Sequence, residues 1–531
     1  MKRNRILGSL VVVVLATALM AHASDGIETQ PVKEDIAPTE ALMLDNNNYF
    51  ACNLFRAVYE QKRGTGSFVV SPISVAYLLG MLGEGANDET RQQITEVLGL
   101  YGSVQDINEH FKTLMEQASR VDTSVAIKIA NRIDVNPAFT FIPQYKADMQ
   151  KYYHAQCGVL DFNDGNYLIK INDWCKEQTD GMIPEILDQI DPSVVMFLLN
   201  AVYFKASWTK KFDPNETRNG RFTMQDGTTV KLKMMHRQAQ FAYGCNDLYE
   251  MLRMPYGNKA YSMYVLLPRE GKTVGDVIHS LTPQGLEEQR KNEMQMHTVD
   301  VLMPSFTTST ETLLNDVLSV MGMPRAFSYR FAEFRNMVNE DDLYVSMMKQ
   351  RAKIEVNEDG TKAAAVTIAA MKDRSAMVSS QFIAFHATRP FVYCLIEEST
   401  GTIYFMGTYC GEEVGSKDDH PVETKEYVYR SVEQMPRFPG GEAALMKYVK
   451  SHIHYPPQAN GVQGHVVVQF VVDKTGKVGE VKVVHSLDKY LDNEAVRICK
   501  SLPRFTPGRQ KGQAVPVWYT LPITFWPPKN N

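Results

Sequence analysis

The sequence predicts an α+β protein built from one large and one small domain, and three observations lead to this fold class. Its 531 residues are more than one ordinary core organises. Helix-like segments come first and long strand-like runs follow, without regular alternation of strand and helix, so large mixed or antiparallel sheets are expected. A charged stretch punctuated by Gly and Pro, residues 413–428, predicts a linker, and a second pattern follows it at 429–531.

The composition is that of an ordinary globular protein. Apolar residues make up 44% and charged residues 22%, and the net charge is -5 without a polybasic tract. A nucleic-acid surface and a basic membrane patch are therefore not expected.

The first 23 residues have the pattern of an export signal. Basic residues at positions 2, 3 and 5 precede an apolar run over 6–21, and Ala21 and Ala23 are small enough for a cleavage site. Cleavage after Ala23 is expected, with a polar segment over 24–41. The alternative is an uncleaved anchor helix, but the run is shorter than the ~20 residues that a membrane span needs.

The large domain is expected over 42–412. After a first helix through Leu54 and Val58, "SPISVAYLLGMLGEGANDETRQQITEVLGL" predicts a buried helix, a Gly-Ala-Asn-Asp turn and an amphipathic helix. Strand-like runs follow: "VVMFLLNAVYFKASW", "YSMYVLLP", "VDVLMPSF", "AKIEVN", "FVYCLIEE" and "TIYFMGTY".

The small domain, 429–531, has its own α+β pattern. It predicts a helix in "GEAALMKYVKSHI", strands in "HVVVQFVVD" and "KVGEVKVVHS", a helix in "DNEAVRICKSL" and a last pair of strands in "AVPVWYTLPITFW".

The sequence shows no common catalytic or metal-binding pattern. It contains no Gly-x-Ser-x-Gly elbow, His-Glu-x-x-His helix, Walker loop or clustered Cys-x-x-Cys. His154 and Cys157 have no second pair nearby, so no metal and no cofactor are expected. The seven cysteines are scattered, which is not the pattern of a disulfide scaffold; Cys394 and Cys410 are either a facing pair or, more simply, buried free thiols.

The segment "VNEDGTKAAAVTIAAMKDRS", residues 356–375, has an uncharged centre and two possible conformations. As a strand, it places Thr361, Ala363, Ala365, Thr367, Ala369 and Met371 on one uncharged face and both lysines on the other. Its alanines also allow a helix, which would contain β-branched residues at 366–368.

This segment resembles the reactive-centre loop of a serpin, and other motifs extend the resemblance over about residues 42–412. "KIEVNEDGTKAAAVTI" resembles the family's hinge, and "TRPFVYCLIEESTGTIYFMGTY" resembles the two strands after the loop. Further similarity lies, in the family's order, in "SPISVAYLLGMLGEGANDETRQQI", "INDWCKEQTDGMIPEIL", "FLLNAVYFKASWTKKF", "MPSF" and "MGMPRAF". The resemblance implies the serpin fold, with large mixed sheets and an exposed loop.

The resemblance also implies a reactive bond and a hinge. The bond lies about sixteen residues after the hinge glutamate, at Arg374-Ser375, with Met371 or Lys372 as alternatives if the register differs. The matching hinge residues are Glu358, Gly360, Thr361, Ala363, Ala364 and Ala365. An arginine before the bond predicts trypsin-like serine proteases or arginine-specific cysteine proteases as targets, because guanidinium pairs with a carboxylate in the primary pocket.

The resemblance carries further positions and two departures. Ser71, Ser74, Asn200 and Gln350 match a polar cluster beneath the sheet opening, and Trp208 matches a tryptophan where insertion begins; plain core packing is the alternative. Lys362 replaces a common hinge glutamate. Ser305 stands where a lysine often pairs with the glutamate matched by Glu358, and loss of that pair is expected to loosen the start of the loop.

The small domain resembles the C-terminal domain of TonB-like proteins, on "MPRFPGGEAALMKYVKSHIHYPP", "GVQGHVVVQFVVDKTGKVGEVKVV" and "LPRFTPGRQKGQAVPVWYTLPITF". The two resemblances imply a monomeric suicide-substrate inhibitor from a Gram-negative bacterium, not an enzyme, and the N-terminal signal pattern adds that it is exported. It would be periplasmic, cell-surface or extracellular, with a small domain that docks in the envelope. The alternatives are a non-inhibitory carrier or chaperone of the same family, and an envelope adaptor that binds TonB-dependent receptors.

Overall fold

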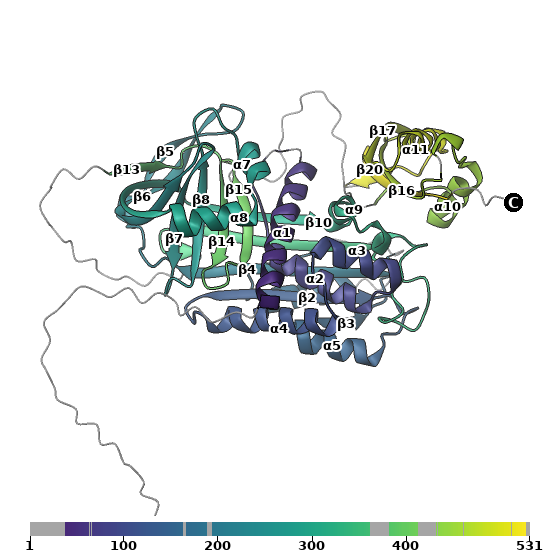
Figure 1. Cartoon of the computed structure of the whole chain (residues 1–531), viewed down its shortest axis with the longest axis horizontal. Coiled ribbons are helices and arrows are strands. Elements are labelled where there is room, and N and C mark those ends of the chain that lie inside the picture. The colour runs from purple at the N-terminus through teal and green to yellow at the C-terminus, as the bar shows by residue number, and fades with distance from the viewer. Residues whose placement is uncertain are drawn as a thin grey trace, which may run out of the picture.

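The computed structural model describes residues 38–361, 382–411 and 432–526, apart from short gaps at 63, 65, 163–165, 188–193, 433, 460 and 511. These residues form an N-terminal body, residues 38–411, and a C-terminal unit, residues 432–526. Figure 1 shows the C-terminal unit beside α9, at the end of the molecule opposite β13. The α+β fold class predicted from the sequence is confirmed.

One sheet of the body has nine strands in the order β1-β15-β14-β8-β7-β6-β9-β13, and β5 pairs with β6. Its strands are β1 (Phe68–Val70), β5 (Arg218–Thr223), β6 (Thr229–Cys245), β7 (Tyr249–Tyr256), β8 (Tyr261–Pro268), β9 (Gln295–Pro304), β13 (Ile383–His386), β14 (Phe391–Glu397) and β15 (Ile403–Tyr409). Every residue of β8, β14 and β15 is buried, which explains their near-continuous apolar sequences.

The other sheet of the body has six strands in the order β10-β11-β12-β4-β2-β3. They are β2 (Ala126–Val135), β3 (Gln156–Val159), β4 (Met196–Ser207), β10 (Phe306–Leu313), β11 (Met347–Asn357) and the two-residue β12 (Gly360–Thr361). Strand β11 buries alternate residues, as a strand with one face on the core does.

Helices surround and separate these sheets. They are α1 (Pro38–Gln61), α2 (Pro72–Gly85), α3 (Asp88–Leu98), α4 (Val104–Arg120), α5 (Pro143–Tyr153), α6 (Tyr167–Gln178), α7 (Val274–Ser280), α8 (Pro283–Glu288) and α9 (Leu314–Met321), with the short turns η1 (Pro214–Glu216), η2 (Gln289–Glu293) and η3 (Pro324–Phe327). Helix α2 is apolar on all sides because it is buried along nearly its whole length. Helix α1 begins at Pro38, inside the polar segment 24–41 and before the large domain expected from residue 42.

The two faces of β4 belong to different cores. Leu198, Val202, Phe204 and Ala206 join the main core between the sheets. Phe197, Leu199 and Ala201 join a smaller cluster beneath α6. The six-stranded sheet is therefore covered on both faces near β4.

The C-terminal unit has a three-stranded sheet, β17-β16-β20, and a two-stranded one, β18-β19. Its elements are α10 (Gly441–His452), η4 (Pro457–Ala459), β16 (Gly464–Val472), β17 (Val478–His485), α11 (Lys489–Ser501), β18 (Gly508–Gln510), β19 (Gln513–Val515) and β20 (Val517–Phe525). The core lies between the helices and one face of the larger sheet, where Val468 and Phe470 meet Leu445 and Ile498.

The structure also bears on the cysteines and on membrane insertion. Cys394 and Cys410 are both buried and form no disulfide with each other, so the alternative of a bonded pair is wrong; the Cys410 thiol donates to the carbonyl of Gly66 at 3.4 Å. Within the described residues, no group of His, Cys, Asp or Glu side chains could hold a metal ion. In the same part of the chain, no helix is sufficiently long and apolar to span a membrane.

Candidate functional site at the opening of the six-stranded sheet

The site is a slot between two strands of the six-stranded sheet. Strands β11 and β4 run parallel and pair directly from Met347 opposite Phe197 to Lys353 opposite Tyr203. Beyond this point β12 lies between them, with Thr361 opposite Val356 on one side and opposite Ala206 on the other. Gly360 and Thr361 of the predicted hinge therefore already form a short strand between β11 and β4.

Gly360 permits this close approach of three strands. Its φ is +145°, and a Cβ atom there would lie 2.1 Å from the carbonyl oxygen of Ala206 and 2.7 Å from the Cα of Ser207. Backbone atoms cannot yield at such distances, so only glycine fits this position.

Thr361 is fully buried and hydrogen-bonded. Its Oγ1 lies 2.9 Å from the hydroxyl of Tyr256. The ring of Tyr256 stacks on Trp208 with centroids 4.2 Å apart, and Trp208 donates its Nε1–H to the carbonyl of Asn357 at 2.9 Å. Burial raises the pKa of Tyr256, so its hydroxyl stays protonated and available for this hydrogen bond.

Two acidic residues fasten the chain just before the slot. Thr217 donates its hydroxyl to Glu358 at 2.8 Å, and Lys211 pairs with Asp359 at 3.0 Å. The backbone N–H groups of Trp208 and Phe212 donate to the carbonyls of Asp359 and Glu358, both at 2.9 Å.

These contacts involve Glu358, the residue that a lysine at position 305 would be expected to hold. A hydroxyl and a neighbouring ion pair hold Glu358 and Asp359 in place of the lysine that Ser305 replaces. Sequence reasoning missed Thr217 and Lys211 because neither lies near residue 358 in the chain.

The four residues expected in a polar cluster do lie together, buried beneath the directly paired part of β4 and β11. The Gln350 amide donates to Ser74 at 2.8 Å and to Asn200 at 3.0 Å, and its oxygen accepts from the Ser71 N–H at 3.0 Å. Ser74 donates to Asn200 at 2.8 Å, and Asn200 donates to Asn131 at 2.9 Å. Asn131 is a further member that the sequence did not reveal.

The remaining predicted residues divide into two groups. Trp208 lies at the top of the slot, apart from the polar cluster. Ala363, Ala364, Ala365, Arg374 and Ser375 lie outside the described residues. The chain resumes just before β13, which pairs with β9 in parallel.

A family model identifies this arrangement. The model of the serpins, described as serine protease inhibitors, matches residues 45–411. The chain belongs to the serpin family. A model of the Gram-negative bacterial TonB protein C-terminal domain matches residues 451–527, so the C-terminal unit of this serpin is a TonB C-terminal domain.

Similar proteins agree with this assignment. The leukocyte elastase inhibitor of Sus scrofa is 32% identical over 372 residues, which cover 68% of this chain and 97% of that protein. Serpin B8 of Homo sapiens is 31% identical over 375 residues, covering 69% and 98%. The crystal structure of the thermophilic serpin tengpin in its native state superposes with a TM-score of 0.65 at 29% identity, covering 73% of this chain and 98% of that one. This serpin is accordingly a protease inhibitor by family, and not an enzyme.

Proposed function

We propose that this serpin is an exported suicide-substrate inhibitor of proteases that cleave after arginine, with its reactive bond at Arg374-Ser375. The observation that carries the proposal is that Gly360 and Thr361 pair as a short strand between β11 and β4. A loop that already begins as a strand needs only to continue in the same register to insert fully.

The register separates the loop into a core face and an outer face. If the loop continued along β4 in this register, its core-facing residues would lie opposite alternate residues of β4. In order, Thr361, Ala363, Ala365, Thr367, Ala369 and Met371 would face Ala206, Phe204, Val202, Asn200, Leu198 and Met196. All but Asn200 of these β4 residues belong to the main core. The core-facing loop residues are uncharged, so insertion buries no unpaired charge.

The register also supplies a partner for Thr367, the one polar loop residue that would enter mid-sheet. It would fall level with Asn200 on one side and with Gln350 on the other. Both belong to the polar cluster, and a buried hydroxyl is tolerated where such partners exist. The cluster would therefore receive the inserted loop as well as hold the two strands together beforehand.

Capture follows from cleavage of the loop. The protease nucleophile attacks the carbonyl carbon of Arg374, the bond to the nitrogen of Ser375 breaks, and the new amine takes a proton. An acyl-enzyme ester, or a thioester for a cysteine protease, then joins Arg374 to the protease. Strand insertion carries this ester away from Ser375 and stabilises the trapped state.

The decisive experiment mixes the protein with trypsin and looks for a complex that withstands boiling in detergent. A complex is expected for the natural sequence and for Lys372→Ala, and no trypsin complex for Arg374→Ala. Cleavage without a stable complex, for trypsin and every other arginine-specific protease tried, indicates a non-inhibitory serpin instead. An undiminished complex with Arg374→Ala moves the bond elsewhere.

We further propose that the TonB C-terminal domain docks this inhibitor in the envelope after export by residues 1–23. Strands β17 and β20 are the edges of its three-stranded sheet, and an edge strand can pair with an extended segment of a partner. Deletion of residues 413–531 should leave trypsin inhibition intact and release the protein from envelope fractions. Loss of inhibition, or unchanged fractionation, contradicts this division of roles.

A further inference from the structure

The second face of the C-terminal sheet is buried, although the helices of its own unit cover only the first face. Val467 is 1% exposed, Gln469 2%, Val471 7% and Trp518 4%, yet none of these side chains joins the core beneath α10 and α11. The N-terminal body lies against this face: the hydroxyl of Thr520 on β20 donates to Asp316 on α9 at 3.2 Å.

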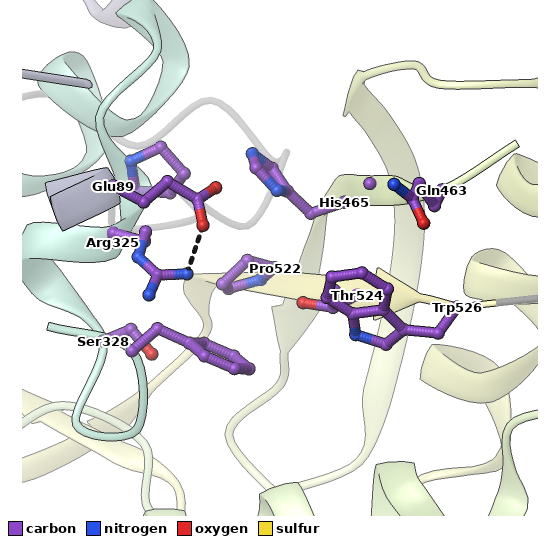
Figure 2. A pocket seen from close by; sticks show the side chains of 11 residues that line it. Glu89, Arg325, Ser328, Gln463, His465, Pro522, Thr524 and Trp526 are labelled. Atoms are coloured by element: carbon purple, nitrogen blue, oxygen red, sulfur yellow. Dashed lines mark hydrogen bonds and ion pairs between the residues drawn. The ribbon is translucent and has the colours of Figure 1, made fainter. Parts of the chain in front are cut away.

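A small cavity lies along this interface, next to η3. Figure 2 shows Arg325 and Ser328 on the body side, opposite His465, Pro522 and Trp526 of the C-terminal unit. Arg325 is held there by Glu89 at 2.7 Å and by Glu333 at 3.2 Å. Trp526 forms the outer wall and is 68% exposed.

The same two elements of the body, α9 and η3, also form the far end of the slot. Asn315, the residue before Asp316, donates to the carbonyl of Ser346 at 3.1 Å and accepts from the Met348 N–H at 2.8 Å. The Val345 N–H donates to Ala326 of η3 at 2.9 Å. The C-terminal unit therefore contacts the elements that hold the first residues of β11.

The register of the seated hinge leads the loop to this end. Thr361 lies opposite Ala206 and Val356, so Met371, ten residues on, would fall level with Met196 and Ser346. At about 3.3 Å per residue, the loop would travel roughly 33 Å between these levels. Arg374 follows Met371 by three residues and would emerge past the ends of both strands.

We propose that the C-terminal unit forms part of the surface against which a captured protease comes to rest. This inference rests on the proposed function, because the protease reaches this end of the sheet only through its covalent bond to Arg374. The contact surface is Trp526 with Phe331 of the body, which lines the same cavity, and the exposed Tyr329 two residues before Phe331 in the chain. Tyr329 packs edge-on against Tyr344, two residues from Ser346, with ring centroids 5.8 Å apart. Tyr329 thus connects the proposed surface to the chain segment that leads into β11 at the end of the slot.

A photo-crosslinking experiment tests this contact in the full chain. Trp526 is replaced by the photoreactive residue p-benzoylphenylalanine, which an exposed position tolerates. The matched control places it at Tyr490, which is 45% exposed at the start of α11, on the helix-covered face of the same sheet. Each variant is incubated with trypsin, irradiated, and treated with hydroxylamine to cleave the acyl ester.

The expected result is a crosslink to trypsin from position 526, resistant to hydroxylamine and several-fold stronger than from position 490. It should be absent with a trypsin variant whose catalytic serine is alanine, which binds the loop but is not carried along the sheet. An ester-linked complex without a crosslink from position 526, or an equal crosslink with the inactive trypsin, overturns the contact alone. Absence of any ester-linked complex refutes the proposed function and the contact with it.

Discussion

Replacing Thr361 with arginine should turn this serpin from an inhibitor into a substrate. Thr361 is fully buried between β11 and β4, with its hydroxyl against Tyr256. An arginine there would bring a charged group into the core with no carboxylate opposite it. Gly360 and the substituted residue 361 would leave their position between β11 and β4. After cleavage, the loop could insert into the sheet only by burying the guanidinium.

The size of this effect follows from the cost of burying a charge. An unpaired ion in a protein interior costs several kcal/mol after relaxation. A penalty of about 4 kcal/mol on the first step of insertion would slow that step by a factor of roughly 10³. Hydrolysis of the acyl-enzyme would then precede insertion, and the protease would be released active.

The assay is titration of trypsin with each variant, followed by gel electrophoresis of boiled samples. Thr361→Arg should give cleaved chain and no stable complex. Thr361→Ser keeps a small hydroxyl and should form the complex normally. Lys362→Arg carries the same guanidinium one residue later, on the outer face by the alternation of the strand, and should also form it.

One result would refute the reasoning about the slot. If Thr361→Arg forms a boiling-stable complex in full yield, insertion does not pass through the seat observed at Thr361. If Lys362→Arg fails as severely as Thr361→Arg, the two faces of the loop are not distinguished by the core, and the register is wrong.

Three further predictions test the surroundings of the slot and the stability of the body. Gly360→Ala should displace β12 from between β11 and β4, because the new Cβ would lie 2.1 Å from a carbonyl oxygen, and the fluorescence of Trp208 should shift to the red. The control is Gly271→Ala, where φ is +77° but the surrounding space is open, and it should leave the emission unchanged. Gln350→Leu should lower the free energy of unfolding, measured in urea, by about 2–4 kcal/mol, because it leaves several buried polar groups without partners. The exposed Gln92→Leu should change this free energy by less than about 0.5 kcal/mol. Equal effects of the two substitutions would contradict a stabilising role for the polar cluster. Burial lowers the pKa of His110 from 6.5 to about 4, so its neutral ring, 2.8 Å from the Asn47 amide, favours the folded state above pH 6.5. That stability should be lost as the pH falls from 6.5 towards 4, by up to about 3 kcal/mol. Thermal unfolding of His110→Gln should show a smaller loss of stability over this pH range. An identical pH profile for the two proteins would exclude the His110 ring as the cause.

The fold class and most of the strands could be predicted from the letters alone, and the same alternation predicts two faces for the loop. Periodicity shows these directly, because side chains alternate along a strand and each residue's face depends only on its near neighbours. Thus the small, uncharged set from Thr361 to Met371 is visible in the printed letters. The family motifs also brought Ser71, Ser74, Asn200 and Gln350 to notice, although they lie far apart in the chain.

Which side chains meet one another depends on the tertiary structure. Thr217 and Lys211 hold the hinge acids, Tyr256 receives Thr361, and Asn131 completes the polar cluster, across separations of 69 to 148 residues. No local pattern encodes such partners, since they are selected by strand order and packing. The same holds for the second face of β16 and β20: Val467, Val471 and Trp518 are apolar, but only the fold shows that α9 and η3 of the body lie against this face.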